Sequence, residues 1–358
     1  MVLKENLTRL IQAIEENPAC DIEEIQELVQ DTPDGEVYAS AKLFIKLCHS
    51  LTNALVKTKR SVSGINLLTT AITKYQAHRL QLTSIHSDLC LLCLDSKCLN
   101  PALKFLDIDH TDIRKSDERE EDVRHVLLYY YYGGLIYAAL KNFERASHFF
   151  EVVLTVPANV ISPIMQETYK KHIITTLLLK GKLPENLLPK YTSPCVLRQK
   201  KQLCHTYSKL AHEYASLNYD KIRRLINNGS PTYERDENMG LIKQCLTQVH
   251  KRNIQRLTKT FLTLPLRKVA SCVGLANERE AEMYILNMID DGEIFATINQ
   301  KDGMVVFQDN PERYDSMAIF QKLQDEMSTS TMLIKALKKL DAETPIDAKI
   351  LNKTSNEI

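Results

Sequence analysis

The chain has 358 residues, of which 44% are hydrophobic and 25% are charged. This composition is typical of a globular protein and excludes a largely disordered one, and the length allows two or three hydrophobic cores. The 46 basic and 45 acidic residues leave a net charge of +1, which disfavours a general attraction to nucleic acid or to a membrane surface. No apolar run reaches the length of a membrane-spanning helix.

The cysteines and the N-terminal residues indicate the compartment. The nine cysteines lie mostly within apolar helical pattern, as in a reduced intracellular protein. Glu5, Glu15 and Glu16 interrupt the apolar positions of the first residues, which favours an amphipathic helix over a signal peptide. We therefore expect a protein of the cytoplasm and nucleus.

Residues 3–219 show helical periodicity and predict no strand. Apolar residues recur at helical spacing in 3–14, 22–29, 37–55, 65–75, 82–92, 99–106, 164–179 and 197–217. Helices this short are marginal alone, so their succession predicts a mostly α, right-handed, tetratricopeptide-like solenoid over residues 1–185. A turn is expected at 32–35, and the mixed charges of 114–122 indicate a solvated loop or helix start.

One helix pair carries a tetratricopeptide-like signature. Its spaced residues are Tyr130, Gly134, Tyr137, Ala146 and Phe150. Gly134 and Ala146 are small enough to let the two helices approach closely. Phe143 and Phe150 are expected to fill the space between this pair and the next.

A second domain is expected over residues 195–310, after prolines at 184, 189 and 194. Helices at 197–217 and 219–226 precede a predicted turn at 228–231, and a further helix begins at Asn238. A basic helix then runs to Pro265, followed by a short helix ending at Gly274 and a third helix over 277–291 capped by Asn277. An extended run at 293–298, a hairpin turn at Asp302-Gly303 and a return over 304–307 complete a winged helix.

The charge of this winged helix disfavours DNA reading. Its third helix carries five acidic residues against Arg279 alone, a net charge of −4 where phosphates would have to bind. The basic residues are one helix earlier: Lys251, Arg252, Arg256, Lys259, Arg267 and Lys268. A solvated face or an acidic protein partner is favoured for them, and RNA contact through 251–268 remains the alternative.

The sequence shows no set of residues typical of an enzyme. Cys90 and Cys93 have the spacing of half a zinc site, with Cys98 nearby, but no second half follows and both lie among leucines. His205 and His212 lack a carboxylate partner, and no metalloprotease, phosphate-loop, nucleophile-elbow or kinase motif is present. We therefore expect no catalytic residue, no cofactor and no metal.

Two surfaces are instead predicted to bind protein partners. The first is the exposed strand edge of the winged helix, where another strand can be added: Ile294, Phe295, Ala296, Thr297 and Ile298. The second is an apolar stripe on a C-terminal helix over 312–341: Phe320, Leu323, Met327, Leu333 and Leu337. Docking of this helix on its own chain is the alternative, and 342–358 is expected to be disordered.

Several segments resemble the PCI-domain family, a module shared by the proteasome lid, the signalosome and translation initiation factor three. They include QLTSIHSDLCLLCL, YYYYGGLIYAALKNFERA, NIQRLTKTFLTL and DDGEIFATINQKDGMV. Within that family the chain is similar to subunits of the COP-nine signalosome. The resemblance implies a non-catalytic scaffold subunit in a complex that removes a ubiquitin-like modifier from cullins. A subunit of the proteasome lid or of initiation factor three is the alternative.

The resemblance also implies the partners. They are other PCI subunits and metalloprotease-fold subunits of the signalosome and, indirectly, cullin-based ubiquitin ligases, with neither DNA nor a membrane. PCI subunits of the family line their winged helices edge to edge and gather their C-terminal helices into a bundle. Those are the two surfaces that the strand edge and the apolar stripe predict.

Overall fold

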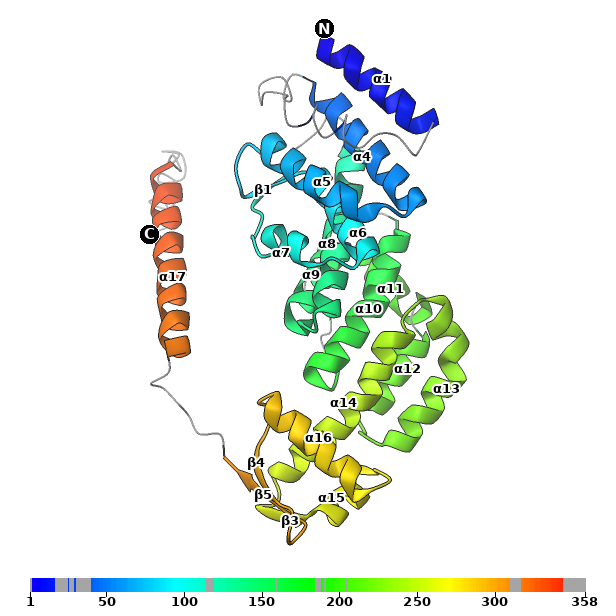
Figure 1. Cartoon of the computed structure of the whole chain (residues 1–358), viewed down its shortest axis with the longest axis vertical. Helices are drawn as coiled ribbons and strands as arrows, with labels where there is room; N and C mark the ends of the chain where they lie inside the picture. The colour runs from blue at the N-terminus through cyan, green and yellow to red at the C-terminus, as the bar shows by residue number, and fades with distance from the viewer. Residues whose placement is uncertain are drawn as a thin grey trace, which may run out of the picture.

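A computed structural model describes residues 2–16, 25, 29, 40–113, 119–158, 160–183, 188–189, 191–203, 205–309 and 317–343. Most of the helix predicted at 22–29, the turn at 32–35, residues 114–118 of the charged run and the tail from 344 lie outside this range. Figure 1 shows an elongated arrangement in which helices follow one another from the N-terminus to a small winged helix at the far end. A separate helix, α17, follows the winged helix.

The N-terminal helices share one hydrophobic core. They are α1 (Val2–Glu16), α4 (Ala41–Thr58), α5 (Ser61–Tyr75), α6 (Ile85–Ser96), α7 (Asn100–Leu106), α8 (Arg119–Ala139) and α9 (Phe143–Thr155). Leu68, Leu92 and Phe150 lie in that core with no exposed surface. Each helix buries its apolar stripe on its neighbours, as the periodicity predicted.

The prediction that residues 3–219 contain no strand is wrong at one place. Gln81–Leu82 (β1) pairs in parallel with Asp112–Ile113 (β2), just before α6 and after α7. Leu82, expected to begin a helix, therefore lies in a strand. Two residues carry too little pattern to predict a strand, and the partner strand is far away in the sequence.

The tetratricopeptide-like pair is formed by α8 and α9, which cross closely at Gly134. A Cβ atom at this position would lie within 2.9 Å of three ring atoms of Phe150. Phe150 therefore fills the space within the pair, which corrects its expected place between pairs. Phe143 does pack against the next core, and Tyr137 donates a hydrogen bond from its hydroxyl to Asp107 Oδ1 at 2.7 Å.

A second core is built from α10 (Pro163–Lys180), α11 (Pro194–Leu203), α12 (His205–Tyr214), α13 (Tyr219–Arg235) and most of α14 (Met239–Thr258). Local sequence sets the bounds of α10. The Ser162 hydroxyl accepts a hydrogen bond from the Ile164 amide, Pro163 begins the helix, and Gly181 ends it at φ 72°.

The turn predicted at 228–231 is wrong, because α13 continues through it with Pro231 inside the helix. Ile222, Ile226 and Tyr233 are buried on one side of α13, so packing of this stripe outweighs the local turn preference. Gly229 is buried on the same side, where a Cβ would meet Tyr233 and Thr206.

Buried polar groups join α10 to the chain around the end of α13. Lys170 Nζ lies 2.9 Å from Asp236 Oδ2, and Tyr207 donates its hydroxyl hydrogen to the same carboxylate at 3.0 Å. Lys171 donates to Asn238 Oδ1 at 2.8 Å. Burial alone would raise the pKa of Asp236, but the hydrogen bonds from Lys170 and Tyr207 outweigh it and lower that pKa.

The winged helix has its own core and contains β3 (Thr263–Pro265), α15 (Leu266–Val273), α16 (Glu278–Asp290), β4 (Phe295–Asn299) and β5 (Met304–Gln308). Gly274 ends α15 at φ 79°, as predicted. Asn277 stands at the N-cap of α16 without making a side-chain capping bond. The basic helix does not reach Pro265: α14 ends at Thr258, and β3 forms because it pairs with β5.

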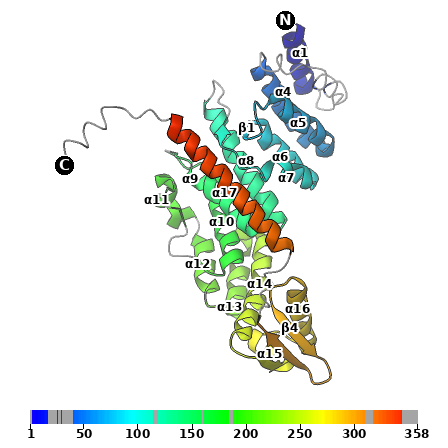
Figure 2. The same cartoon turned by 90° about the vertical axis from the view of Figure 1, so that its left-hand side faces the viewer.

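After the winged helix, α17 (Met317–Glu343) stands as one continuous helix away from the stacked helices (Figure 1). It runs back along their length toward the N-terminal end of the molecule (Figure 2). Its described residues are mostly exposed. None of the helices in the described part of the chain combines the length and apolar character that crossing a bilayer requires.

Candidate protein-interaction surfaces

The sheet of the winged helix has the order β3-β5-β4, so β4 occupies one edge. The opposite edge strand, β3, has only three residues and includes Pro265, which offers no amide hydrogen. β4 has five residues and no proline. Of the two edges, β4 is therefore the better template for an added strand.

The predicted edge residues divide between two faces of the sheet. Ala296 pairs with Phe307 and Ile298 with Val305, and both partners are buried in the winged-helix core. Thr297 is exposed and pairs with Val306 on the outer face. Ile294 precedes β4 and its side chain is buried, so at this position only the backbone is near the edge. The binding role of these residues stays a prediction.

The helix α14 positions the winged helix, because it belongs to two cores. Ile242 and Val249 lie in the second core, whereas Ile254 lies in the core of the winged helix. A continuous helix that is buried at both ends is a stiff connection between them. The edge of β4 is thereby held in a defined orientation on the stacked helices.

Two of the basic residues considered for RNA contact instead bind groups within the chain. Lys251 Nζ lies 2.8 Å from Asp291 Oδ2 and 2.9 Å from Glu293 Oε1. Burial alone would lower the pKa of Lys251, but these hydrogen bonds outweigh it and raise that pKa. Arg252 Nη2 donates to the carbonyl oxygens of Leu178 and Leu179, each at 2.9 Å. It thus caps the C-terminal end of α10 with a cation, a role that the sequence pattern did not reveal.

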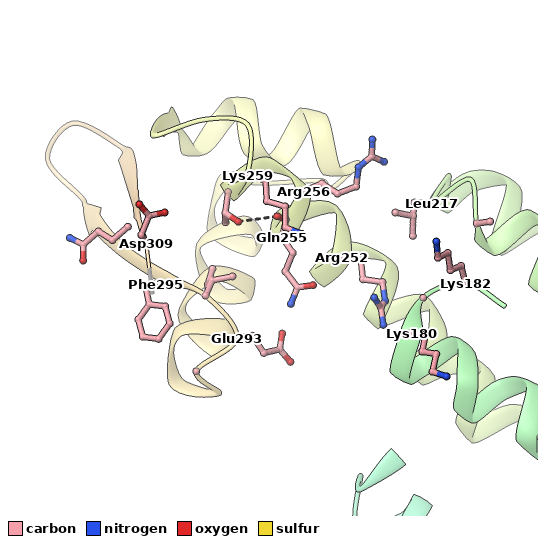
Figure 3. A pocket seen from close by; sticks show the side chains of 16 residues that line it. Lys180, Lys182, Leu217, Arg252, Gln255, Arg256, Lys259, Glu293, Phe295 and Asp309 are labelled. Atoms are coloured by element: carbon pink, nitrogen blue, oxygen red, sulfur yellow. Dashed lines mark hydrogen bonds between the residues drawn. The ribbon is translucent and has the colours of Figure 1, made fainter. Parts of the chain in front are cut away.

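A hollow of about 880 Å³ lies between the end of α10, α14 and the winged helix (Figure 3). Five basic side chains line it: Lys180, Lys182, Arg252, Arg256 and Lys259. Glu293 and Asp309 are its acidic residues, and Phe295 lies on the winged-helix side. The charge balance of the hollow favours an anionic occupant.

The five residues predicted on the C-terminal helix are all 58–70% exposed in α17. Phe320 and Met327 are seven residues apart, and Ile334, which the prediction omitted, continues this spacing. Leu323 lies three residues after Phe320, and Leu337 lies three residues after Ile334. This is the a and d pattern of a helix that packs in a coiled coil or bundle, and Leu333 lies beside that stripe.

The two cysteines considered for metal binding lie in the core, whereas the two histidines are exposed. Cys90 and Cys93 are buried, and burial raises the pKa of the Cys93 thiol to about 11. Both thiols are therefore protonated near neutral pH and are poor metal ligands. His205 and His212 both lie on α12.

Comparisons with known proteins match nearly the whole chain. Residues 2–196 match the family model for the N-terminal helical repeats of COP9 signalosome complex subunit 3, and residues 231–309 match the PCI domain. COP9 signalosome complex subunit 3 of Drosophila melanogaster is 40% identical over 346 residues, covering 93% of this chain and 77% of that protein. The protein of the same name from Arabidopsis thaliana is 33% identical over 342 residues, covering 96% and 78%.

Proposed function

Since this chain belongs to the family of COP9 signalosome complex subunit 3, we propose that it is a non-catalytic scaffold subunit of that complex. It acts in the removal of a ubiquitin-like modifier from cullin subunits of ubiquitin ligases, in the cytoplasm and nucleus. The observation that supports the scaffold role is that two separate surfaces, the outer edge of strand β4 and the apolar stripe of α17, are left without a packing partner among the described residues. The fold places them on different elements, so each can hold a different neighbour.

The first surface takes a strand from a neighbouring PCI subunit. Because β5 occupies one side of β4, the backbone groups on the other side of β4 are available for pairing. Main-chain hydrogen bonds supply affinity in this mode, and side chains on the two sheet faces supply specificity. Thr297 and Val306 offer a small, exposed outer face next to the new strand.

The second surface packs into a bundle with the C-terminal helices of other subunits, including those with a metalloprotease fold. Met327 and Ile334 are 70% and 53% exposed in the chain by itself. Burying such side chains contributes about 1.5–3 kcal/mol each. A stripe of this length therefore favours a stable helical partner.

Proline substitutions at two adjacent positions test the β4 surface. Neighbouring residues of an antiparallel strand direct their amides to opposite sides. The Phe307 amide donates to Leu262 on the β3 side, so Val306 faces β4 and its partner Thr297 faces β5. Thr297→Pro therefore removes an amide that faces β5, whereas Ala296→Pro removes an outward one. The first should lower the melting temperature of the wing. The second should keep the circular dichroism spectrum but lose co-purification with the neighbouring PCI subunit. Full co-purification of the folded variant would refute the β4 contact.

A pair of aspartate substitutions tests the α17 surface. Ile334→Asp places a charge in the apolar stripe, whereas Ala336→Asp places the same charge about 200° further around the helix. Both positions are exposed, so neither variant should alter the fold of the rest of the chain. We expect only Ile334→Asp to lose the subunits bound through the bundle. Equal retention by both variants would show that the stripe is not the contact.

The basic hollow supports RNA contact as a second candidate function. Arg256 and Lys259 are exposed there, beside Lys180 and Lys182. Filter binding of a single-stranded RNA should weaken as salt rises, and Arg256→Ser with Lys259→Ser should reduce both affinity and salt dependence. Lys268→Ser, on α15 outside the hollow, is the control. Absence of binding at low salt would refute this function and leave the scaffold role untouched.

A further inference from the structure

Three side chains with metal-binding chemistry meet inside the N-terminal repeats. His49 comes from α4, Asp88 from α6 and His125 from α8. Each offers one ligand atom, and these atoms all lie within 4.8 Å of one another. His49 Nδ1 is 2.5 Å from Asp88 Oδ2, and the two imidazole rings are stacked with centroids 4.2 Å apart. Three helices that are far apart in the sequence thus direct these groups to one point.

A neighbouring hydroxyl sets the tautomer of His125. The Ser87 hydroxyl donates its hydrogen to the carbonyl oxygen of Ser84 at 2.7 Å. Its contact of 2.8 Å with His125 Nδ1 must then be one in which Ser87 accepts and the imidazole donates. The lone pair of His125 is consequently on Nε2. Metal-binding histidines commonly donate their other ring N–H in this way.

The charges of the cluster favour one cation. Asp88 is buried, and an isolated carboxylate is costly to bury without a positive partner. A divalent cation bound by Asp88 and by two neutral imidazoles would supply that partner.

We propose that His49, Asp88 and His125 bind a divalent transition-metal ion, with Zn²⁺ as the ion best suited to them. Two imidazole nitrogens and one carboxylate oxygen, with a fourth position for water, form a common zinc ligand set. The His49 side chain is 21% exposed, which gives the ion a path from solvent. The bound ion joins α4, α6 and α8 and so stabilises the N-terminal repeats.

Binding requires a small rearrangement of the cluster. Zinc–ligand bonds of about 2.0–2.2 Å place tetrahedral ligands roughly 3.3 Å apart, less than the present limit of 4.8 Å. The lone pair of an imidazole nitrogen lies in the ring plane, and the two rings are within 9° of parallel. One ring therefore turns about its Cβ–Cγ bond when both bind the same ion. His49 is the one that turns, because Ser87 already holds His125. The proton shared by His49 Nδ1 and Asp88 Oδ2 is released to solvent when these groups bind the ion.

Zinc titration of the full chain against a chromogenic chelator tests this site. The exposed thiols of Cys98 and Cys272 can bind zinc themselves, so the titration uses a background in which both are serine. We expect one equivalent of tightly bound Zn²⁺ in that background, and a higher melting temperature when it is bound. Co²⁺ in place of Zn²⁺ should give the visible absorption of a tetrahedral site.

Single substitutions identify the ligands. His125→Gln should abolish the tight equivalent and the rise in melting temperature. Ser87→Ala should weaken zinc binding about 10–100-fold, because it removes the group that orients His125. His148→Gln changes an exposed histidine on α9 and should bind zinc like the background protein.

The measurement without metal separates folding from binding. In the presence of a chelator, His125→Gln should melt near the melting temperature of the background protein. A loss of zinc binding by this variant then reports the loss of a ligand and not misfolding. Were that variant misfolded, His49→Gln provides the same test from another helix. Equal zinc affinity in the background, His125→Gln and His49→Gln proteins would overturn the proposal, as would the absence of any bound equivalent in the background.

Discussion

Gly134→Leu tests the close crossing of α8 and α9 on which the tetratricopeptide-like pair depends. The new Cβ would lie within 2.9 Å of three ring atoms of Phe150, and neither Phe150 nor Ala146 has any exposed surface through which to move aside. Overpacking typically costs about 1–3 kcal/mol of unfolding free energy. Leucine adds three further carbons beyond Cβ, so its cost should be near the upper end, about 3 kcal/mol. The better helix propensity of leucine returns about 1 kcal/mol. The net loss of unfolding free energy is about 2 kcal/mol.

Differential scanning calorimetry measures this loss. At about 2–4 °C per kcal/mol for a unit of this size, the melting temperature of the N-terminal repeats should fall by about 4–8 °C. Gly240→Leu is the matched control, because a Cβ at this helical position in α14 has no atom within 4 Å. That variant should melt no lower than the unmodified protein. An unchanged melting temperature for Gly134→Leu, or an equal fall for Gly240→Leu, would refute the packing argument.

Three further predictions concern Arg252, Asp236 and the cysteines. Arg252→Met removes both hydrogen bonds to the end of α10 and should lower the urea unfolding free energy by about 2–3 kcal/mol. The folded-state pKa of Asp236 is lowered, so its stabilisation is present above the unfolded pKa of about 3.9 and is lost as the pH falls through the folded value. Asp236→Asn should therefore be less stable at pH 7 and lose less stability between pH 7 and 3 in urea titrations. Cys98 and Cys272 are exposed and should react rapidly with a disulfide reagent, whereas the buried Cys48 should react only after unfolding.

Much of the winged helix could be predicted from its residues. Gly274 ends α15 because a residue without Cβ adopts φ 79° at no steric cost. The alternation through β4 and β5 is equally visible in the sequence, with Val305 and Phe307 buried and Val306 exposed. The sequence also predicts the stripe on α17, but the predicted stripe lacks Ile334, which completes the heptad spacing.

The incorrect predictions share one physical cause. In each case, a segment that is distant in the sequence determines the local structure. Pro231 and Gly229 favour a turn locally, yet the buried stripe of α13 keeps both in the helix. Residues 259–264 continue a helical pattern, yet pairing with β5 draws Thr263–Pro265 into a strand. In the sequence, Arg252 belongs to a basic helix face. Its two carbonyl partners become apparent only when α10 packs beside α14.

By itself, the sequence of this protein determined most of the helical segments, the glycine that ends α15 and the strands that carry the alternating pattern of the wing. These properties depend on neighbouring residues along the chain, so they can be predicted without knowledge of the fold. The tertiary structure alone decided that β3 takes one side of β5 and leaves β4 at the edge. It also decided that His49, Asp88 and His125 meet at one point. Such contacts arise only after loops have closed and helices have packed, and no local spacing encodes them.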